Sequence, residues 1–428
     1  MSATRRLLLG LGATFACGRK ALAQAGSGAG MPTDVYQAIF ERYAGYGVKA
    51  TGGAGDSSCG AWLEDQLKAY GYTVARQGFE APAFDVESAF LSTGPVKTAV
   101  WPQPIVVQTP PAGLTAKLAV MGQQPVAGAI ALVVLPSRRW STAVAPEIRG
   151  PVAAAFAAGA LAVVVVTTGP SGQALALNAP ADKPLHDKPV AVLAPDAAKP
   201  FIEAAAAGRD GLLQVRGRAY STRAFNVIGA LDRGAGRTLV ISTPRSGWFT
   251  CMGERGPGIA VWLALARWAV RPELDCDIRL LATSGHEYEN LGGAHFLEEA
   301  APPPDRTALW LHLGANVAAR DWRDTPNGAE PLPTADPQRV LMATPGLIGA
   351  LTAEFRGQPG LERPVTPQER APAGELANIL AARYPQAIGI FGSHRLHHAP
   401  TDDLRCVSAP LAREVADSFA RVISSRLG

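Results

Sequence analysis

The chain has 428 residues, more than one compact domain of usual size contains, so we expect about two domains. Hydrophobic residues make up 47% of it and charged residues 18%, which excludes wholesale disorder and allows a sizeable core. The formal net charge is only +4, and no basic run of the kind found in nucleic-acid-binding proteins is present.

The N-terminus has the pattern of an export signal. Arg5 and Arg6 precede an apolar stretch, Leu7 to Cys17, and small residues from Ala21 to Ala25 suit cleavage after an A-x-A pattern. The paired arginines resemble a twin-arginine signal. The alternative is a short membrane anchor, but the apolar stretch is too short to span a bilayer. We therefore predict a signal peptide at residues 1–25 and a periplasmic or secreted protein that is not membrane-bound once the signal is removed.

Residues 26–85 begin the first predicted domain. Apolar residues recur at helical spacing from Cys59 to Tyr70, and Gly71 ends the predicted helix. The segment Tyr72 to Phe79 then alternates as a strand does. We expect this segment to belong to the same domain as residues 220–428.

Residues 86–219 have a different texture, with short β-type runs separated by proline and glycine and with few charges. Pro151 to Gly159 predicts a helix that leads directly into the apolar strand Ala162 to Thr167. A helix followed in this way by a buried strand resembles the protease-associated domain. We therefore predict a small β-rich domain inserted into the first. The other elements expected in it are strands at Ile130–Leu135 and Pro189–Ala194 and a helix at Asp196–Ala207.

Residues 220–428 alternate regularly between predicted strands and helices. This alternation predicts an α/β fold, a mostly parallel mixed sheet flanked by helices, in which ligands bind beyond the carboxyl ends of the strands. The expected strands are Asn226–Leu231, Thr238–Ser242, Asp277–Thr283, Leu309–Leu313 and Ala387–Phe391. The expected helices are Pro257–Val270, Leu291–Ala300, Gly346–Phe355, Glu375–Tyr384 and Pro410–Leu427.

Four cysteines follow the predicted signal peptide, and none has C-x-x-C spacing, which argues against a zinc ribbon. An oxidising compartment leaves one or two disulfides open among Cys59, Cys251, Cys276 and Cys406.

Histidines and carboxylates gather in or after four of the predicted strands. Six of the seven histidines lie between residues 286 and 398. Imidazole together with carboxylate suits Zn²⁺ or a similar divalent ion. The residues concerned are Glu254, His286, Glu287, His312, His394, His397 and His398.

The order of these motifs resembles the zinc-dependent aminopeptidase family that includes bacterial leucine aminopeptidases and glutamate carboxypeptidase. The resemblance covers nearly the whole chain after the signal peptide, and a protease-associated insertion also occurs in that family. Its features are Asn226–Gly229, Leu239–Ile241, Gly256–Ala260, Thr283–Glu287 with Leu291–Gly293, and His398–Asp402.

The resemblance implies two metal ions, but the ligand set departs from the family pattern at most positions. The His and Asp expected after the first central strand are missing from Ser242–Ser246. Glu254 stands at the bridging Asp, and His286–Glu287 stands at the Glu–Glu pair. His312 replaces an Asp ligand. Only Glu287 and His398 match outright.

We therefore predict an exported hydrolase of a peptide-like or amide substrate with one zinc ion. Glu254, Glu287 and His398 are the expected ligands, and His312 is a candidate fourth. His286, whose imidazole titrates near neutrality, is the expected general base. The predicted substrate-binding residues are Arg245 or Arg255, for a carboxylate, and Trp248, for the pocket wall.

The alternative is a catalytically inactive aminopeptidase-like protein without metal, which binds a ligand or a partner through the cleft or through the inserted domain. Single residues also have alternative roles. Instead of binding metal, Glu254 could form an ion pair with Arg255 or Arg245. His312 could instead be a hydrogen-bonded residue of the core. His394 and His397 fit solvated loop positions as well. Asp402 is expected to fix a turn or to support His398.

Overall fold

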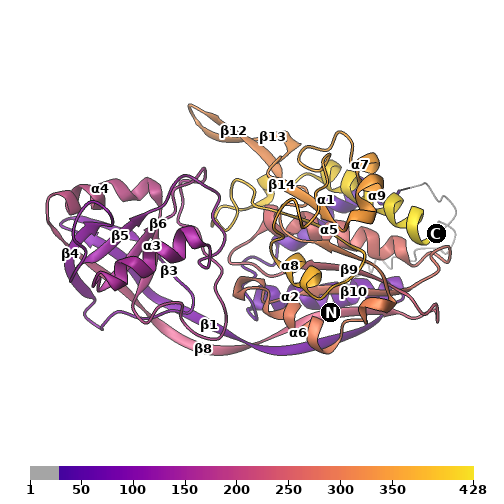
Figure 1. The fold of residues 1–428 in the computed structure, drawn as a ribbon, viewed down its shortest axis with the longest axis horizontal. Coiled ribbons are helices and arrows are strands. Elements are labelled where there is room, and N and C mark those ends of the chain that lie inside the picture. Colours follow the sequence, from indigo (N-terminus) through magenta and orange to yellow (C-terminus); the bar gives the residue numbers. More distant parts are fainter. Residues whose placement is uncertain (1–27) are drawn as a thin grey trace, which may run out of the picture.

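The computed structural model describes residues 28–428, and the predicted signal peptide at residues 1–25 lies outside them. One part of the molecule is built around a mixed sheet (Figure 1). Its central strand β9 (Thr238–Pro244) pairs in parallel with β10 (Asp277–Thr283) and β11 (Thr307–Leu313). Beyond β11 lie β15 (Ala387–Gly392), also parallel, and the antiparallel edge strand β14 (Arg339–Ala343). The predicted sheet is thus confirmed.

Helices cover both faces of this sheet. Successive side chains of β9 point to opposite faces, and on each face they are apolar and need to be buried. Leu239 and Ile241 belong to the large apolar core on one face, and Val240 belongs to a smaller cluster on the other. The first face is covered by α1 (Thr33–Ala44), α2 (Ala54–Tyr70), α5 (Met252–Ala269) and α9 (Ala409–Leu427), with α7 (Ile348–Glu354) packed on α9. The second face is covered by α6 (Leu291–Glu299) and α8 (Glu375–Ala381).

Two long antiparallel strands, β1 (Thr73–Thr93) and β8 (Asp210–Leu231), run from this part of the molecule to a second lobe (Figure 1). They pair from Thr73 opposite Ala230 to Ser92 opposite Leu212. The C-terminal part of β8 pairs with β10, whereas its N-terminal part pairs with a strand of the second lobe. The ribbon therefore joins the two lobes through continuous backbone hydrogen bonding.

The second lobe contains four parallel strands, β4 (Leu114–Val120), β5 (Ile130–Val134), β6 (Ala162–Val166) and β7 (Val190–Leu193). Helices α3 (Pro146–Ala157) and α4 (Pro195–Ala206) lie on opposite faces, in separate apolar clusters. Short strands β2 (Val96–Ala99) and β3 (Trp101–Pro102) complete it. The assignment of residues 86–219 to an inserted protease-associated domain stays a prediction.

A hairpin of β12 (Arg320–Thr325) and β13 (Gly328–Ala335) projects from the first lobe and was not expected (Figure 1). Most of its side chains are exposed or only partly buried, so no apolar alternation marks it in the sequence. Cys59, Cys251, Cys276 and Cys406 are buried free thiols, so none of the disulfides left open by the sequence forms. No helix between residues 28 and 428 combines the length and the hydrophobicity needed to cross a membrane.

Candidate metal site

Glu254 lies in the first turn of α5, because this helix begins at Met252 and not at the predicted Pro257. The helix begins early because a residue distant in the sequence caps its N-terminus. The Asp402 carboxylate accepts hydrogen bonds from the free N–H groups of Gly253 (2.6 Å) and Glu254 (3.1 Å), which starts the helix early. Asp402 thus positions Glu254, a role different from the turn or His398 support expected for it.

The Glu254 carboxylate is 1% exposed and touches two basic groups. Its Oε1 lies 2.6 Å from Nη2 of Arg255 and 3.2 Å from Nε2 of His398. Burial opposes its ionisation, but the charges of Arg255 and His398 outweigh burial and hold the pKa of Glu254 well below its usual value. Glu254 is therefore a carboxylate in a buried cationic environment.

His397 and His398 stack with ring centroids 4.1 Å apart and an interplanar angle of 16°. The Nδ1 atoms of both rings are buried and have no hydrogen-bond partner. His398 has φ +60°, in the left-handed region that costs a residue with a side chain about 1 kcal/mol. Glu254, His397 and His398 each offer a ligand atom within 4.8 Å of the others. Two buried imidazoles, each with an unpartnered ring nitrogen, together with a buried carboxylate fit a divalent cation such as Zn²⁺.

The second lobe holds the backbone of this site in place. The Ala176 N–H donates to the carbonyl of His398 (3.1 Å), and the Ala179 N–H donates to the carbonyl of Glu287 (3.1 Å). Leu396 and Ala399, on either side of the paired histidines, belong to an apolar cluster of the second lobe. Packing between the lobes therefore determines the conformation of the histidine loop.

A second polar group consists of His286, His312 and Glu375, which are all nearly buried. Glu375 Oε1 lies 3.5 Å from Nδ1 of His286, and its Oε2 lies 3.9 Å from Nδ1 of His312. His312 Nδ1 is also hydrogen-bonded to Ser242 Oγ at 2.9 Å. Burial lowers the pKa of His312 to about 4, and burial together with the Arg255 charge lowers the pKa of His286. Both imidazoles are therefore neutral near pH 7.

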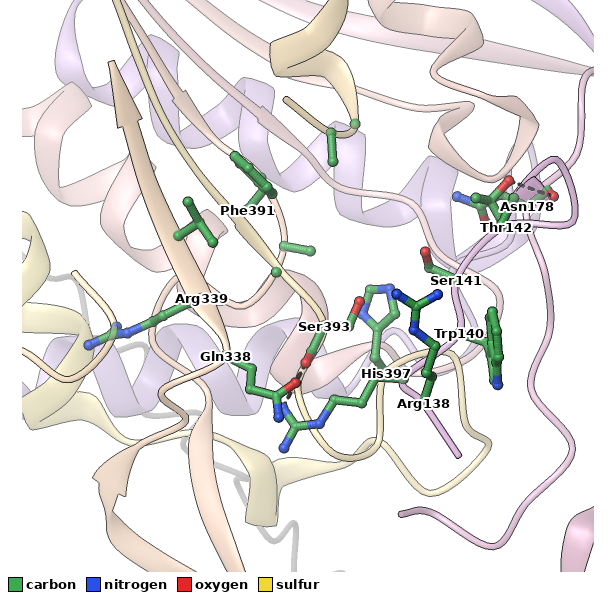
Figure 2. A pocket seen from close by; sticks show the side chains of 18 of the residues that line it. Arg138, Trp140, Ser141, Thr142, Asn178, Gln338, Arg339, Phe391, Ser393 and His397 are labelled. Atoms are coloured by element: carbon green, nitrogen blue, oxygen red, sulfur yellow. Dashed lines mark hydrogen bonds between the residues drawn. The ribbon is translucent and has the colours of Figure 1, made fainter. Parts of the chain in front are cut away.

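The two groups face a cleft of about 1010 Å³ between the lobes. His286, His312 and His397 line it, together with residues 137–142 of the second lobe. Figure 2 shows His397 between Ser393 on one side and Arg138 and Trp140 on the other. The cleft thus gives a molecule in solution access to one histidine of the Glu254 group and to two histidines of the Glu375 group.

The fold that carries these residues is similar to that of several solved structures. BSAP, a zinc aminopeptidase from Bacillus subtilis, matches with a TM-score of 0.66 and 16% identity over 92% of this chain and 94% of its own. A peptidase M28 precursor from Shewanella amazonensis SB2B matches with a TM-score of 0.67 and 17% identity over 92% and 97%. An aminopeptidase from Aneurinibacillus sp. strain AM-1 matches with a TM-score of 0.64 and 17% identity over 92% and 94%.

The chain has the zinc aminopeptidase fold. At these identities the match concerns the fold, and it confirms the resemblance seen in the sequence at that level. No protein-family model matches the sequence, and no curated protein matches it.

Glu287 does not join the other predicted ligands on the aminopeptidase fold. It lies in the 3₁₀ helix η1 (His286–Tyr288), a tight turn whose consecutive side chains diverge. His286 reaches the cleft, whereas the Glu287 carboxylate accepts hydrogen bonds from the Thr51 N–H (2.9 Å) and the Ser246 hydroxyl. The structure thus separates Glu287 from Glu254 and His398, whereas His397 offers a ligand atom within 4.8 Å of both. His312, the candidate fourth ligand, lies with Glu375 instead.

The two predicted substrate-binding arginines are fully buried, so neither offers its guanidinium to a substrate. Arg245 pairs with the buried Asp56 (2.9 Å) and donates to the carbonyls of Ala282 and Phe225. Arg255 is bound to Glu254, as the sequence allowed. Trp248 lines a different and apolar pocket, and its indole N–H donates to Asn178, which lines the cleft.

The sequence did not identify Glu375 as a site residue, and it left solvated loop positions open for His394 and His397. Glu375 was predicted only as the first residue of a helix, and a carboxylate after Gly374 carries no signal of burial. His394 and His397 are buried rather than solvated. His394 is bonded to Asp402 at 3.1 Å, and this carboxylate outweighs the effect of burial and raises the pKa of His394. In the sequence, the three histidines between residues 394 and 398 were the one feature that pointed to a buried polar group there.

Proposed function

We propose that this protein is an exported metal-dependent hydrolase that acts on a peptide-like or amide substrate through a mononuclear zinc site. The proposed ligands are Glu254, His397 and His398. The observation that carries the proposal is the convergence of these three buried side chains within 4.8 Å beside a large cleft, with both imidazole Nδ1 atoms unpartnered. The export part rests on the sequence of residues 1–25 alone.

The chemistry follows from the positions of the residues. A zinc ion, when bound, polarises a carbonyl group and makes water a better nucleophile. His286 is neutral near pH 7 and lines the cleft, and its buried Nδ1 faces Glu375, so its other ring nitrogen, Nε2, is the one to accept a proton from an attacking water. Glu375, whose Oε1 lies 3.5 Å from Nδ1 of His286, stabilises the imidazolium that forms. The cleft between the lobes has room for an extended peptide-like molecule.

A second candidate function is a binding protein without metal. The observation that favours it is the contact of 2.6 Å between Glu254 and Arg255, because the guanidinium already supplies a positive charge to the carboxylate that would hold a cation. Under this alternative the cleft binds a ligand and no bond is cleaved.

Elemental analysis of the purified mature protein distinguishes the two functions. The proposal predicts about one zinc per chain in the wild type, and a loss of this zinc in the His397→Ala, His398→Ala double variant. His186→Ala, in the second lobe, is the matched control and keeps the metal. Absence of zinc after dialysis against a zinc salt, in a folded wild-type protein, contradicts the hydrolase and supports the binding protein.

If zinc is present, a screen of peptides and amides on the loaded protein tests hydrolysis. The His286→Gln variant separates chemistry from metal binding. It is expected to keep the zinc and to lose turnover by about 100-fold or more.

A further inference from the structure

A second cavity, of about 290 Å³, lies on the far side of η1 from the cleft. Its lining comes from the β1–β8 ribbon, the segment before α2, and the loop that follows β3. Trp101, Trp248 and Tyr288 form an aromatic wall, with Trp248 centred 6.4 Å from Trp101 and 5.8 Å from Tyr288, both edge-on. His286 is absent from this lining, whereas Glu287 and Tyr288 belong to it. The cavity is therefore separate from the candidate metal site.

Exposed apolar side chains concentrate at this cavity. Only six large hydrophobic side chains are well exposed between residues 28 and 428, and three of them, Val48, Val86 and Tyr220, line it. Single exposed hydrophobic residues are ordinary, but their grouping around a concave apolar site marks a place where an apolar ligand is removed from water.

The polar groups of the cavity define what such a ligand carries. The indole Nε1 of Trp101 is buried and has no hydrogen-bond partner, which leaves one donor unpaired. The carboxylate of Glu287 already accepts two hydrogen bonds, from Thr51 and Ser246. The only other charged group, Asp85, is paired with Arg218 and Tyr220. The Trp101 N–H is enclosed and not accessible from the cavity, whereas the hydroxyl of Tyr288, a lining residue, has no hydrogen-bond partner among residues 28–428. The Tyr288 hydroxyl is therefore the free donor, and no cationic group lines the cavity to bind an anion.

We propose that this cavity is a binding site for a small neutral molecule with an aromatic or branched aliphatic body and one carbonyl oxygen. The apolar body packs against the aromatic wall, and the carbonyl oxygen accepts a hydrogen bond from the Tyr288 hydroxyl. The cavity volume lies at the lower end of the range of ligand pockets, about 300 Å³, which suits a molecule with a single ring. The site does not depend on metal or on hydrolysis.

Acetophenone is a suitable probe, because it has one ring and one carbonyl. Calorimetry and saturation-transfer NMR on the full mature chain should show saturable binding with one site per chain. Benzoate, with the same ring but a negative charge, should bind at least about tenfold more weakly, since the site has no cation to compensate its desolvation. Failure of acetophenone to saturate a site, or equal binding of benzoate, overturns the proposal.

Two variants locate the site. Ala83→Trp fills the cavity from its partly buried wall and should abolish acetophenone binding. The matched control Ala75→Trp is at an exposed position of the same strand outside the cavity and should bind normally. Unchanged binding to the Ala83→Trp variant places acetophenone elsewhere and overturns the proposal.

A third variant tests the hydrogen bond and remains informative if the Ala83→Trp variant does not fold. Tyr288→Phe keeps the aromatic ring and removes the hydroxyl. It should weaken acetophenone binding by about three- to tenfold and leave the binding of ethylbenzene, which has no acceptor, almost unchanged. Equal effects on both molecules contradict the role of Tyr288.

Discussion

Nη2 of Arg255 lies 2.6 Å from Oε1 of Glu254, and both side chains are buried from solvent. The two residues are consecutive in the first turn of α5, yet both side chains lie at the centre of the candidate site. Burial is the largest cause of the lowered pKa of His286, and the Arg255 charge is the next. The pKa of His397 is lowered by burial, His398 and His394, and then by the Arg255 charge. This guanidinium thus affects both polar groups at the cleft.

The Glu254–Arg255 pair should show strong coupling in stability. Removing one partner leaves a buried charge without compensation, so Arg255→Met and Glu254→Gln should each lower the free energy of unfolding by about 3–5 kcal/mol. The double variant should lose less than the sum of the two. Urea unfolding of the four proteins measures this coupling. The control is Arg323→Met, which breaks the exposed pair with Glu330 and should cost about 1 kcal/mol or less. Additive single effects would show that the pair is not coupled.

Glu375 should tune the protonation of His286. Burial and Arg255 lower the pKa of His286, and the neighbouring Glu375 carboxylate raises it in part. Glu375→Gln removes the raising influence, so the pKa of His286 should fall further, as measured by NMR titration. If His286 is the general base, the acid limb of the pH–rate profile should move to lower pH by the same amount. A higher pKa in the variant would contradict this arrangement.

His312 should make stability depend on pH. Its pKa is about 4 in the folded protein and about 6.5 when unfolded, so the unfolded chain binds more protons between these values. The free energy of unfolding should therefore fall as the pH falls from about 6.5 to 4, by about 3 kcal/mol from this group. Thermal or urea unfolding across this range should show a shallower slope in His312→Gln. An unchanged slope would mean that His312 does not contribute.

The Asp402 cap should support both α5 and the candidate site. Asp402→Ala frees the N–H groups of Gly253 and Glu254, so it should cost about 1–2 kcal/mol of stability and reduce zinc retention. The neighbouring Asp403 accepts from Arg405 and is partly exposed, which makes Asp403→Ala a matched control. That control should leave the zinc content unchanged. Equal metal loss in both variants would indicate general destabilisation and not loss of the cap.

The sequence by itself determined the α/β architecture, because apolar periodicity and strand-to-helix alternation report burial directly. Every strand predicted between residues 226 and 391 forms, and the resemblance to zinc aminopeptidases is confirmed at the level of fold. Periodicity also placed Glu254, His286, His312 and His398 near strand ends, where a cleft was expected. The exposed hairpin β12–β13 has no such pattern and was missed.

Only the tertiary structure decided which of these side chains meet. Glu287 and His286 are adjacent in sequence, but contacts from Thr51 and Ser246 turn Glu287 away from the cleft. His397 enters the Glu254 group because the second lobe packs against its loop. Glu375 reaches His286 and His312 from α8, which is distant from both in the sequence. Side-chain direction in a turn depends on hydrogen bonds to distant segments, and a local pattern of residue types carries no record of those partners.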